Sequence, residues 1–197
     1  MITNTLRDTI TRWRTGMDHT SHHHWQNART LTHLGELTAA WLTGELQSQP
    51  TYHGPCDVDT EPGLRLALIH LNRHGMVTTS SQAGFCGRGT DSARWSQCAA
   101  VEGFADQPAA EQIAWLAEHH QLTFRSGRPI TVTYRNNHPY TQFGRCLTEG
   151  KIRNPRTGYG LCHTDGQDAL CNAQQIVIAD PIPGRNTLWA LLNGGVV

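Results

Sequence analysis

The feature that most constrains the fold is an apolar stripe with helical spacing across residues 21–47. Intervals of three and four residues are the period of an amphipathic α-helix. Thr30 or Thr32 is placed to cap a restart within this stretch, and Gln49-Pro50 ends it. The stripe, which predicts a helical N-terminal part, consists of Trp25, Ala28, Leu31, Leu34, Leu37 and Trp41, extended by Leu42 and Leu46.

Helix and strand patterns alternate after this stretch. Residues 59–62 read as a helix start, and Gly75 fits the position just past the end of that helix. A strand is expected over 76–81, followed by a glycine-rich loop over 82–89 and an antiparallel return strand over 93–104.

The second half continues the alternation. Asp106, with Pro108 two residues later, opens a third helix. The remaining predicted elements are paired strands over 121–125 and 130–134 joined by a turn at 126–129, strands over 159–162 and 175–179, and a last helix over 187–192 capped by Asn186. This order predicts an α+β fold with a mostly antiparallel sheet packed by three to four helices.

The chain length and its charges limit the class of protein. A length of 197 residues fits one compact domain, for which we expect an N-terminal arm over 1–20 and a single α+β domain over 21–197. Sixteen basic and sixteen acidic residues cancel, which argues against a protein that coats nucleic acid by bulk attraction. Residues 121–160, however, carry seven basic groups and one acidic group, so a local basic face is possible.

Hydropathy and cysteine content indicate the compartment. No apolar run reaches the roughly 18–20 residues needed to span a bilayer. Residues 1–13 lack the apolar core of a secretory signal. We therefore expect a cytoplasmic protein whose six cysteines are reduced.

The segment after the first predicted strand is the most site-like part of the sequence. Hydroxyl groups and backbone amides at a strand end can bind a phosphate or carboxylate, and glycines let a ligand approach the main chain. The alternative is an ordinary hairpin with serines near its tip. The expected ligand-binding residues are Thr79, Ser80, Ser81, Gln82 and Gly84, with Arg94 placed beside them.

Two residues near this loop are candidates for catalysis. Cys86 would act as a nucleophile if a histidine lowered its pKa, with His70, His74, His119 and His120 as the arithmetically possible partners. Glu102 is a carboxylate in a weakly polar strand, where it would serve as an acid/base or pair with Arg94. The alternative for a lone cysteine on a strand is a small core residue.

A basic stretch in the second half suits phosphate contacts. Arginines beside glycines in a hairpin can reach phosphates, and a tyrosine can stack on a base. The alternative is a solvated edge loop. The candidate contact residues are Arg145, Lys151, Arg153, Arg156 and Tyr159.

No strong metal or nucleotide motif is present, so the sequence leaves the cofactor unknown and predicts no metal site. Three adjacent histidines, His22 to His24, point in different directions on a helix and read as a polar surface. Asp57, Asp59 and Glu61 are explained mainly by helix capping. The ligand types for zinc occur at Cys146, Cys162, His163 and Cys171, but without the close cysteine pair of zinc ribbons.

Several separated motifs in residues 25–105 resemble an uncharacterised actinobacterial and prophage domain family. The motifs are the run LTHLGELTAAWLTG over 31–44, Asn72-Arg73-His74-Gly75, the loop TTSSQAG over 78–84, and AAVEGF over 99–104. The chain departs from the family pattern at Ala83, where the family tends to have proline. The resemblance implies a shared fold and a prophage connection, and it transfers no catalytic residue.

These observations favour two hypotheses. The first is a small-molecule-binding domain whose ligand is anionic or nucleotide-like, with hydrolysis or group transfer by Cys86 or Glu102 left open. The alternative is a non-enzymatic interaction protein, phage- or host-related, that binds a protein or nucleic acid through the basic segment 121–160. A weaker option is a dimer seam formed by Trp25 and Trp41.

Overall fold

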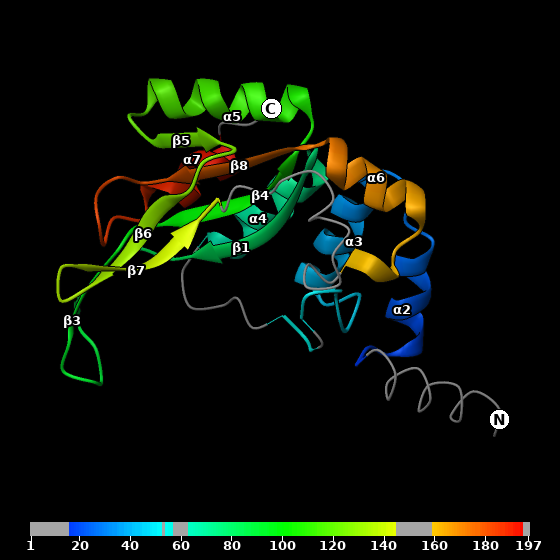
Figure 1. The fold of residues 1–197 in the computed structure, drawn as a ribbon, viewed down its shortest axis with the longest axis horizontal. Helices are drawn as coiled ribbons and strands as arrows, with labels where there is room; N and C mark the ends of the chain where they lie inside the picture. The colour runs from blue at the N-terminus through cyan, green and yellow to red at the C-terminus, as the bar shows by residue number, and fades with distance from the viewer. Residues whose placement is uncertain (1–15, 53, 57–62, 145–158, 195–197) are drawn as a thin grey trace.

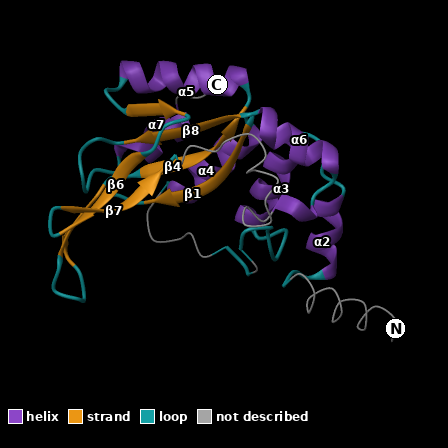
Figure 2. Ribbon diagram, in the orientation of Figure 1, coloured by secondary structure: helices purple, strands orange, loops and turns teal. Residues whose placement is uncertain are grey.

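The computed structural model describes residues 16–52, 54–56, 63–144 and 159–194. Within these ranges, six α-helices and two four-stranded sheets form one compact α+β domain (Figures 1 and 2). All the strand pairs are antiparallel, as the sequence predicts. No helix in the described ranges has both the length and the apolar character needed to cross a bilayer.

The N-terminal apolar stripe folds into two helices, α2 (His19–Gln26) and α3 (Leu31–Thr43). The chain restarts at Thr30, whose side chain accepts a hydrogen bond from the backbone N–H of His33 at 3.1 Å. Gly44 ends α3 in the left-handed conformation that glycine adopts without strain. The internal cap, predicted for Thr30 or Thr32, is confirmed at Thr30.

Trp25 and Trp41 belong to the core. Both are buried, and their indole N–H groups donate to the backbone oxygens of Ser48 and Gly54. The idea of a tryptophan dimer seam is therefore wrong, because neither ring is available to a second copy. Met17 is also buried in this core. Residues 1–15, which belong to the predicted N-terminal segment 1–20, lie outside the described residues.

The first sheet forms the centre of the molecule. Its order is β1 (Met76–Gln82), β4 (Ala100–Ala105), β8 (Gln174–Ala179) and β5 (Thr123–Ser126). Helices α3, α4 (Leu64–Arg73) and α5 (Gln107–His119) contact its strands, and α7 (Thr187–Gly194) packs on α4. Val101, Ile176 and Ile178 of this sheet join the main hydrophobic core with the helices.

The second sheet has the order β2 (Phe85–Arg88), β3 (Arg94–Gln97), β6 (Ile130–Arg135) and β7 (His138–Phe143). It packs on the first sheet through a small apolar cluster of Ala100, Val132, Phe143, Val177 and Ala179. Beyond this cluster, the β2–β3 and β6–β7 hairpins extend away from the helices (Figure 1).

The predicted hairpin of residues 76–104 pairs as expected but spans both sheets. β1 pairs with β4 in the first sheet, and β2 pairs with β3 in the second. The loop expected over 82–89 is therefore wrong for most of its length, because Gln82 ends β1 and residues 85–88 form β2.

Two other predictions in the second half are wrong, and two elements there were not predicted. β5 pairs with β8 rather than with β6, so the turn at 126–129 carries the chain from one sheet to the other. Residues 159–161 form the short 3-10 helix η2 (Tyr159–Leu161) instead of a strand, because Tyr159 packs its ring edge-on against buried Trp25. The two elements that were not predicted are β7 and α6 (Thr164–Asn172).

Two predicted helix ends are confirmed. The Asp106 side chain accepts from the backbone N–H of Ala109 at 2.9 Å and caps α5. Gly75 follows α4 with φ of 87°. The described part of α4 begins at Leu64 after Gly63, and the start predicted at 59–62 lies outside the described residues.

Candidate functional site

The three hydroxyl residues of the predicted ligand loop lie on the second half of β1. The Thr79 hydroxyl donates to the Glu102 carbonyl at 3.4 Å, next to an irregularity in the β1–β4 pairing. Ser80 is exposed and Ser81 is half-buried. These residues are accessible, but they stand on a strand rather than in a glycine-rich loop.

Gln82 joins the two sheets. Its amide nitrogen donates to the carbonyls of Cys98 at 2.9 Å and Val132 at 3.1 Å, and its amide oxygen accepts from the Thr133 hydroxyl at 3.1 Å. Both amide N–H groups are used within the protein. The Gln82 side chain thus links the two sheets, and its ligand-binding role stays a prediction.

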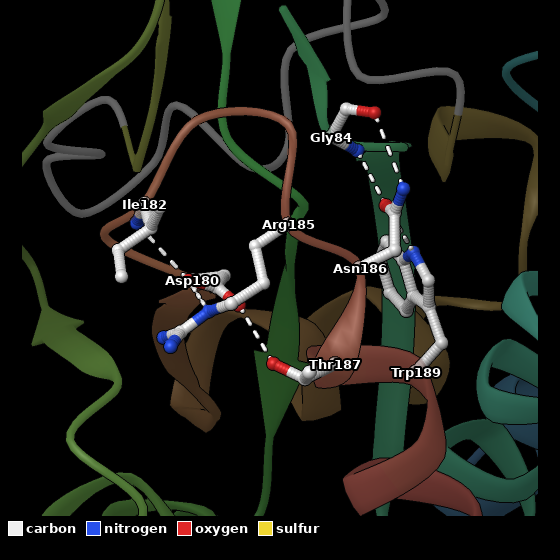
Figure 3. Close-up of polar contacts among 7 residues, drawn as sticks. All are labelled: Gly84, Asp180, Ile182, Arg185, Asn186, Thr187 and Trp189. Carbon is white, nitrogen blue, oxygen red and sulfur yellow. Dashed lines mark hydrogen bonds and ion pairs between the residues drawn. The ribbon is translucent and has the colours of Figure 1, made fainter.

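Gly84 is held by Asn186, from the segment between β8 and α7 (Figure 3). The Gly84 N–H donates to the Asn186 side-chain oxygen at 2.6 Å, and the Asn186 side-chain nitrogen donates to the Gly84 carbonyl at 3.2 Å. A Cβ on Gly84 would lie 2.5 Å from the Arg185 carbonyl oxygen. The close approach that glycine predicts is real, but the approaching group is the protein's own chain.

The Asn186 side chain does not accept a hydrogen bond from a backbone N–H of the last helix, as a capping side chain would. Its side-chain oxygen accepts from Gly84 and from the Trp189 indole at 3.2 Å. The helix is found where it was expected, as α7, while the Asn186 side chain bonds outside the helix backbone.

The same segment contains a buried carboxylate that the sequence analysis missed. Asp180 is fully buried and accepts from Arg185 Nε at 2.6 and 2.8 Å, from the Thr187 hydroxyl at 2.9 Å and from the Ile182 N–H at 3.0 Å (Figure 3). Such a charge requires these partners, because burial without them is costly. The only local signal was the turn composition of residues 181–184, which does not indicate a buried ion pair.

The two candidate catalytic residues lie in different environments. Cys86 is exposed on β2, beside Gly184. The Glu102 carboxylate on β4 accepts the backbone N–H of Gly144, just after the end of β7, and so links the sheets. Arg94 stands opposite Arg88 at the far end of β3, so the structure does not bring it to Glu102.

The histidines proposed as activators of Cys86 lie at the C-terminal ends of α4 and α5, with His74 and His120 just past the last helical residue. His70 in α4 stacks on His74, and His119 stacks on Trp115 in α5, each pair with ring centroids 4.0 Å apart. These arrangements do not support a cysteine–histidine pair at Cys86.

The residues with zinc-ligand chemistry are dispersed. Burial raises the pKa of Cys162 to about 12, and the His163 side chain accepts from the Asp165 N–H at the start of α6. Cys171 is half-buried, and Cys146 lies outside the described residues. Across the described part of the chain, no three histidine, cysteine or acidic side chains are arranged to hold a metal ion.

The basic stretch is only partly described. Arg145, Lys151, Arg153 and Arg156 lie outside the described residues. Tyr159 is 1% exposed, and burial raises the pKa of its hydroxyl. The prediction that Tyr159 stacks on a base is therefore wrong.

An aromatic and arginine cluster, which sequence reasoning missed, lies on the second sheet. The Trp95 and Tyr140 rings meet edge-to-face with centroids 4.8 Å apart, and the Arg135 guanidinium carbon lies 5.8 Å from the Trp95 centroid. Asp91 accepts from Arg135 Nη2 at 2.9 Å and from the Trp95 indole at 3.1 Å. These four side chains come from β3, β6, β7 and the turn between β2 and β3.

From here on, the arm means residues 85–97 and 130–143, the β2–β3 and β6–β7 hairpins, and not the N-terminal residues 1–20. Phe85 on β2 and Tyr140 on β7 are 45% and 63% exposed, so each edge strand of the second sheet presents an aromatic side chain to solvent. The charged side chains of the arm are Arg88, Arg94, Arg135 and Asp91. Asn136 docks the β6–β7 turn on β3 by accepting from the Arg94 N–H at 2.8 Å.

Comparison with known families agrees with the resemblance in the sequence. Residues 20–196 match the family model described as a domain of unknown function (DUF6919). The chain belongs to this family. The prediction of an uncharacterised domain family is thereby confirmed, and the match extends well beyond residues 25–105. Among curated proteins, the chain has no match.

Proposed function

We propose that the DUF6919 domain binds single-stranded nucleic acid through the arm. The observation that carries the proposal is the cluster of Trp95, Tyr140 and Arg135, which presents aromatic rings and a guanidinium together on an exposed sheet. Bases of a single strand stack on such rings in a sequence-tolerant way.

The charge of the arm supports a polyanionic partner. Although the whole chain is formally neutral, the arm carries three arginines and one aspartate, and that aspartate is paired with Arg135. β7 leads directly into the segment that holds Arg145, Lys151, Arg153 and Arg156. Phosphate contacts from such arginines would provide the salt-dependent part of binding.

The exposed rings favour a single strand over a duplex. Aromatic side chains reach a base only where the base is unstacked, as in loops and single strands. Phe85 and Tyr140, on the two edge strands of the second sheet, offer two such contacts. No step of chemistry is needed for this function.

The test is fluorescence anisotropy with a labelled single-stranded oligonucleotide of about 12 nucleotides, at several salt concentrations. Tyr140→Ala should weaken binding by about tenfold, because one base–aromatic stack is worth about 1–3 kcal/mol. Trp115→Ala is the matched control, since Trp115 is 55% exposed on α5 outside the arm. Equal losses in both variants, oligonucleotide binding that is insensitive to salt, or no oligonucleotide binding would contradict the proposal.

A small anionic or nucleotide-like ligand is the second candidate function. It is favoured by Arg185, whose side chain is 35% exposed and is held through Nε by buried Asp180, next to Gly84. A guanidinium anchored in this way leaves its terminal nitrogens to face an oxyanion. Any accompanying hydrolysis or group transfer would fall to Cys86 or Glu102.

This second candidate has its own test. In isothermal titration calorimetry with pyrophosphate, Arg185→Gln should lose one binding event that the wild type shows, whereas Arg73→Gln on the surface of α4 should keep it. Equal pyrophosphate binding by all three proteins would exclude Arg185 as the site.

For the place of action, we propose the cytoplasm. The five cysteines within the described ranges, Cys56, Cys86, Cys98, Cys162 and Cys171, carry free thiols, which supports a reducing compartment. An actinobacterial or prophage origin is likewise a proposal, based on the motifs of the sequence.

A further inference from the structure

The Arg135 guanidinium is paired with a carboxylate of the arm itself. Nε and Nη2 of Arg135 both donate to the same oxygen of Asp91, at 3.0 and 2.9 Å. The two side chains are 44% and 37% exposed, so the pair stands in water at the surface. The same two N–H groups are those with which a guanidinium binds a phosphate.

We infer that Arg135 is a phosphate-binding residue of the arm, and that Asp91 occupies the phosphate position in the free protein. The inference rests on the proposed function, because the phosphate is that of a nucleic-acid strand whose base stacks on Tyr140. Binding then exchanges one oxyanion for another at Arg135.

The surroundings of Asp91 make this exchange feasible. Its second oxygen accepts from the Trp95 indole and from the Ala93 N–H, each at 3.1 Å. These two hydrogen bonds hold the Asp91 side chain in the turn when Arg135 moves to a phosphate. The hydrogen bond from Trp95, followed by that from Arg135, lowers the pKa of Asp91, so the competing charge is present at neutral pH.

The energies favour the strand over the internal carboxylate. An exposed ion pair contributes about 0–1 kcal/mol. A phosphate can offer a separate oxygen to each of the two N–H groups, and its binding also releases condensed counterions. Asp91 therefore weakens strand binding without preventing it, and ligands that lack a phosphate leave the pair intact.

The experiment is a double-mutant cycle on binding of the same oligonucleotide. Asp91→Asn keeps an oxygen for the Trp95 and Ala93 hydrogen bonds but removes the charge. It should tighten binding by up to about fivefold, because an exposed ion pair worth about 0–1 kcal/mol no longer competes for Arg135. In an Arg135→Gln background the same change should have little effect.

A matched control separates pairing from net charge. Asp165→Asn removes the acidic partner of Arg29 in another exposed pair, away from the arm, and should leave binding nearly unchanged. If Asp91→Asn weakens binding or leaves it unaltered, or tightens it equally in the Arg135→Gln background, the inference is wrong.

A second measurement decides the inference even if no oligonucleotide binds. Inorganic pyrophosphate should shift the NMR signal of the Arg135 Nε–H, at lower concentration in Asp91→Asn than in the wild type. A signal that does not move in either protein would exclude the phosphate site. A moving signal without oligonucleotide binding would refute the proposed function and leave the phosphate site standing.

Discussion

The two sheets share one chain and one antiparallel pattern, yet they differ in what covers them. The first sheet is packed by helices, and five of the six residues of β4 are buried. In β2 of the second sheet, three of the four residues are exposed. The contrast separates stability from surface chemistry: the first sheet carries the core, and the arm presents side chains to a partner.

The largest expected effect tests whether stability resides in the core. Trp25→Ala removes a fully buried ring that packs on Tyr159, and should lower the free energy of unfolding by about 3–5 kcal/mol. Tyr140→Ala in the arm should change it by less than about 0.5 kcal/mol. Urea denaturation of the two variants measures both changes. If Tyr140→Ala lowered the free energy of unfolding as much as Trp25→Ala, the distinction between a stabilising core and a solvent-facing arm would be wrong.

A smaller effect is expected at the junction between the sheets. Gln82→Ala removes three hydrogen bonds and leaves the Val132 and Cys98 carbonyls without this donor, which should cost about 1–3 kcal/mol. Gln142→Ala, on the exposed part of β7, has one long hydrogen bond to lose and serves as the control. Equal stability of the two variants in urea would show that Gln82 does not join the sheets.

The smallest effect concerns reactivity alone. Cys86 is exposed on the arm, whereas Cys98 and Cys162 are buried, and burial raises the pKa of both thiols. Because the thiolate is the reactive form, iodoacetamide should modify Cys86 in the native protein and the two buried thiols only after denaturation. Peptide mass mapping reads this directly, and early modification of Cys162 would contradict the packing of η2.

The sequence predicted features that depend on neighbouring residues. The caps at Thr30 and Asp106 and the turn after α4 at Gly75 follow from local hydrogen bonds and backbone preferences. The α+β class follows from the order of the periodic segments. None of these features depends on which strands pair with one another.

The features that were missed or wrongly predicted depend on contacts between segments that are distant in the sequence. Asn186 holds Gly84 across 102 residues, and Arg135 reaches Asp91 across 44. The short turn at 126–129 suggested a hairpin, but β5 pairs with β8, where Phe124 packs against the main hydrophobic core. The aromatic cluster was missed for the same reason, since its members meet only once β3, β6 and β7 are adjacent.

The most direct test of the account is hydrogen–deuterium exchange with and without a single-stranded oligonucleotide of about 12 nucleotides. The arm, residues 85–97 and 130–143, should exchange more slowly in the presence of the strand, while α4 and α5 should not change. Protection confined to the helices, or none in the arm under conditions where the strand binds, would contradict the assignment of the arm as the binding surface.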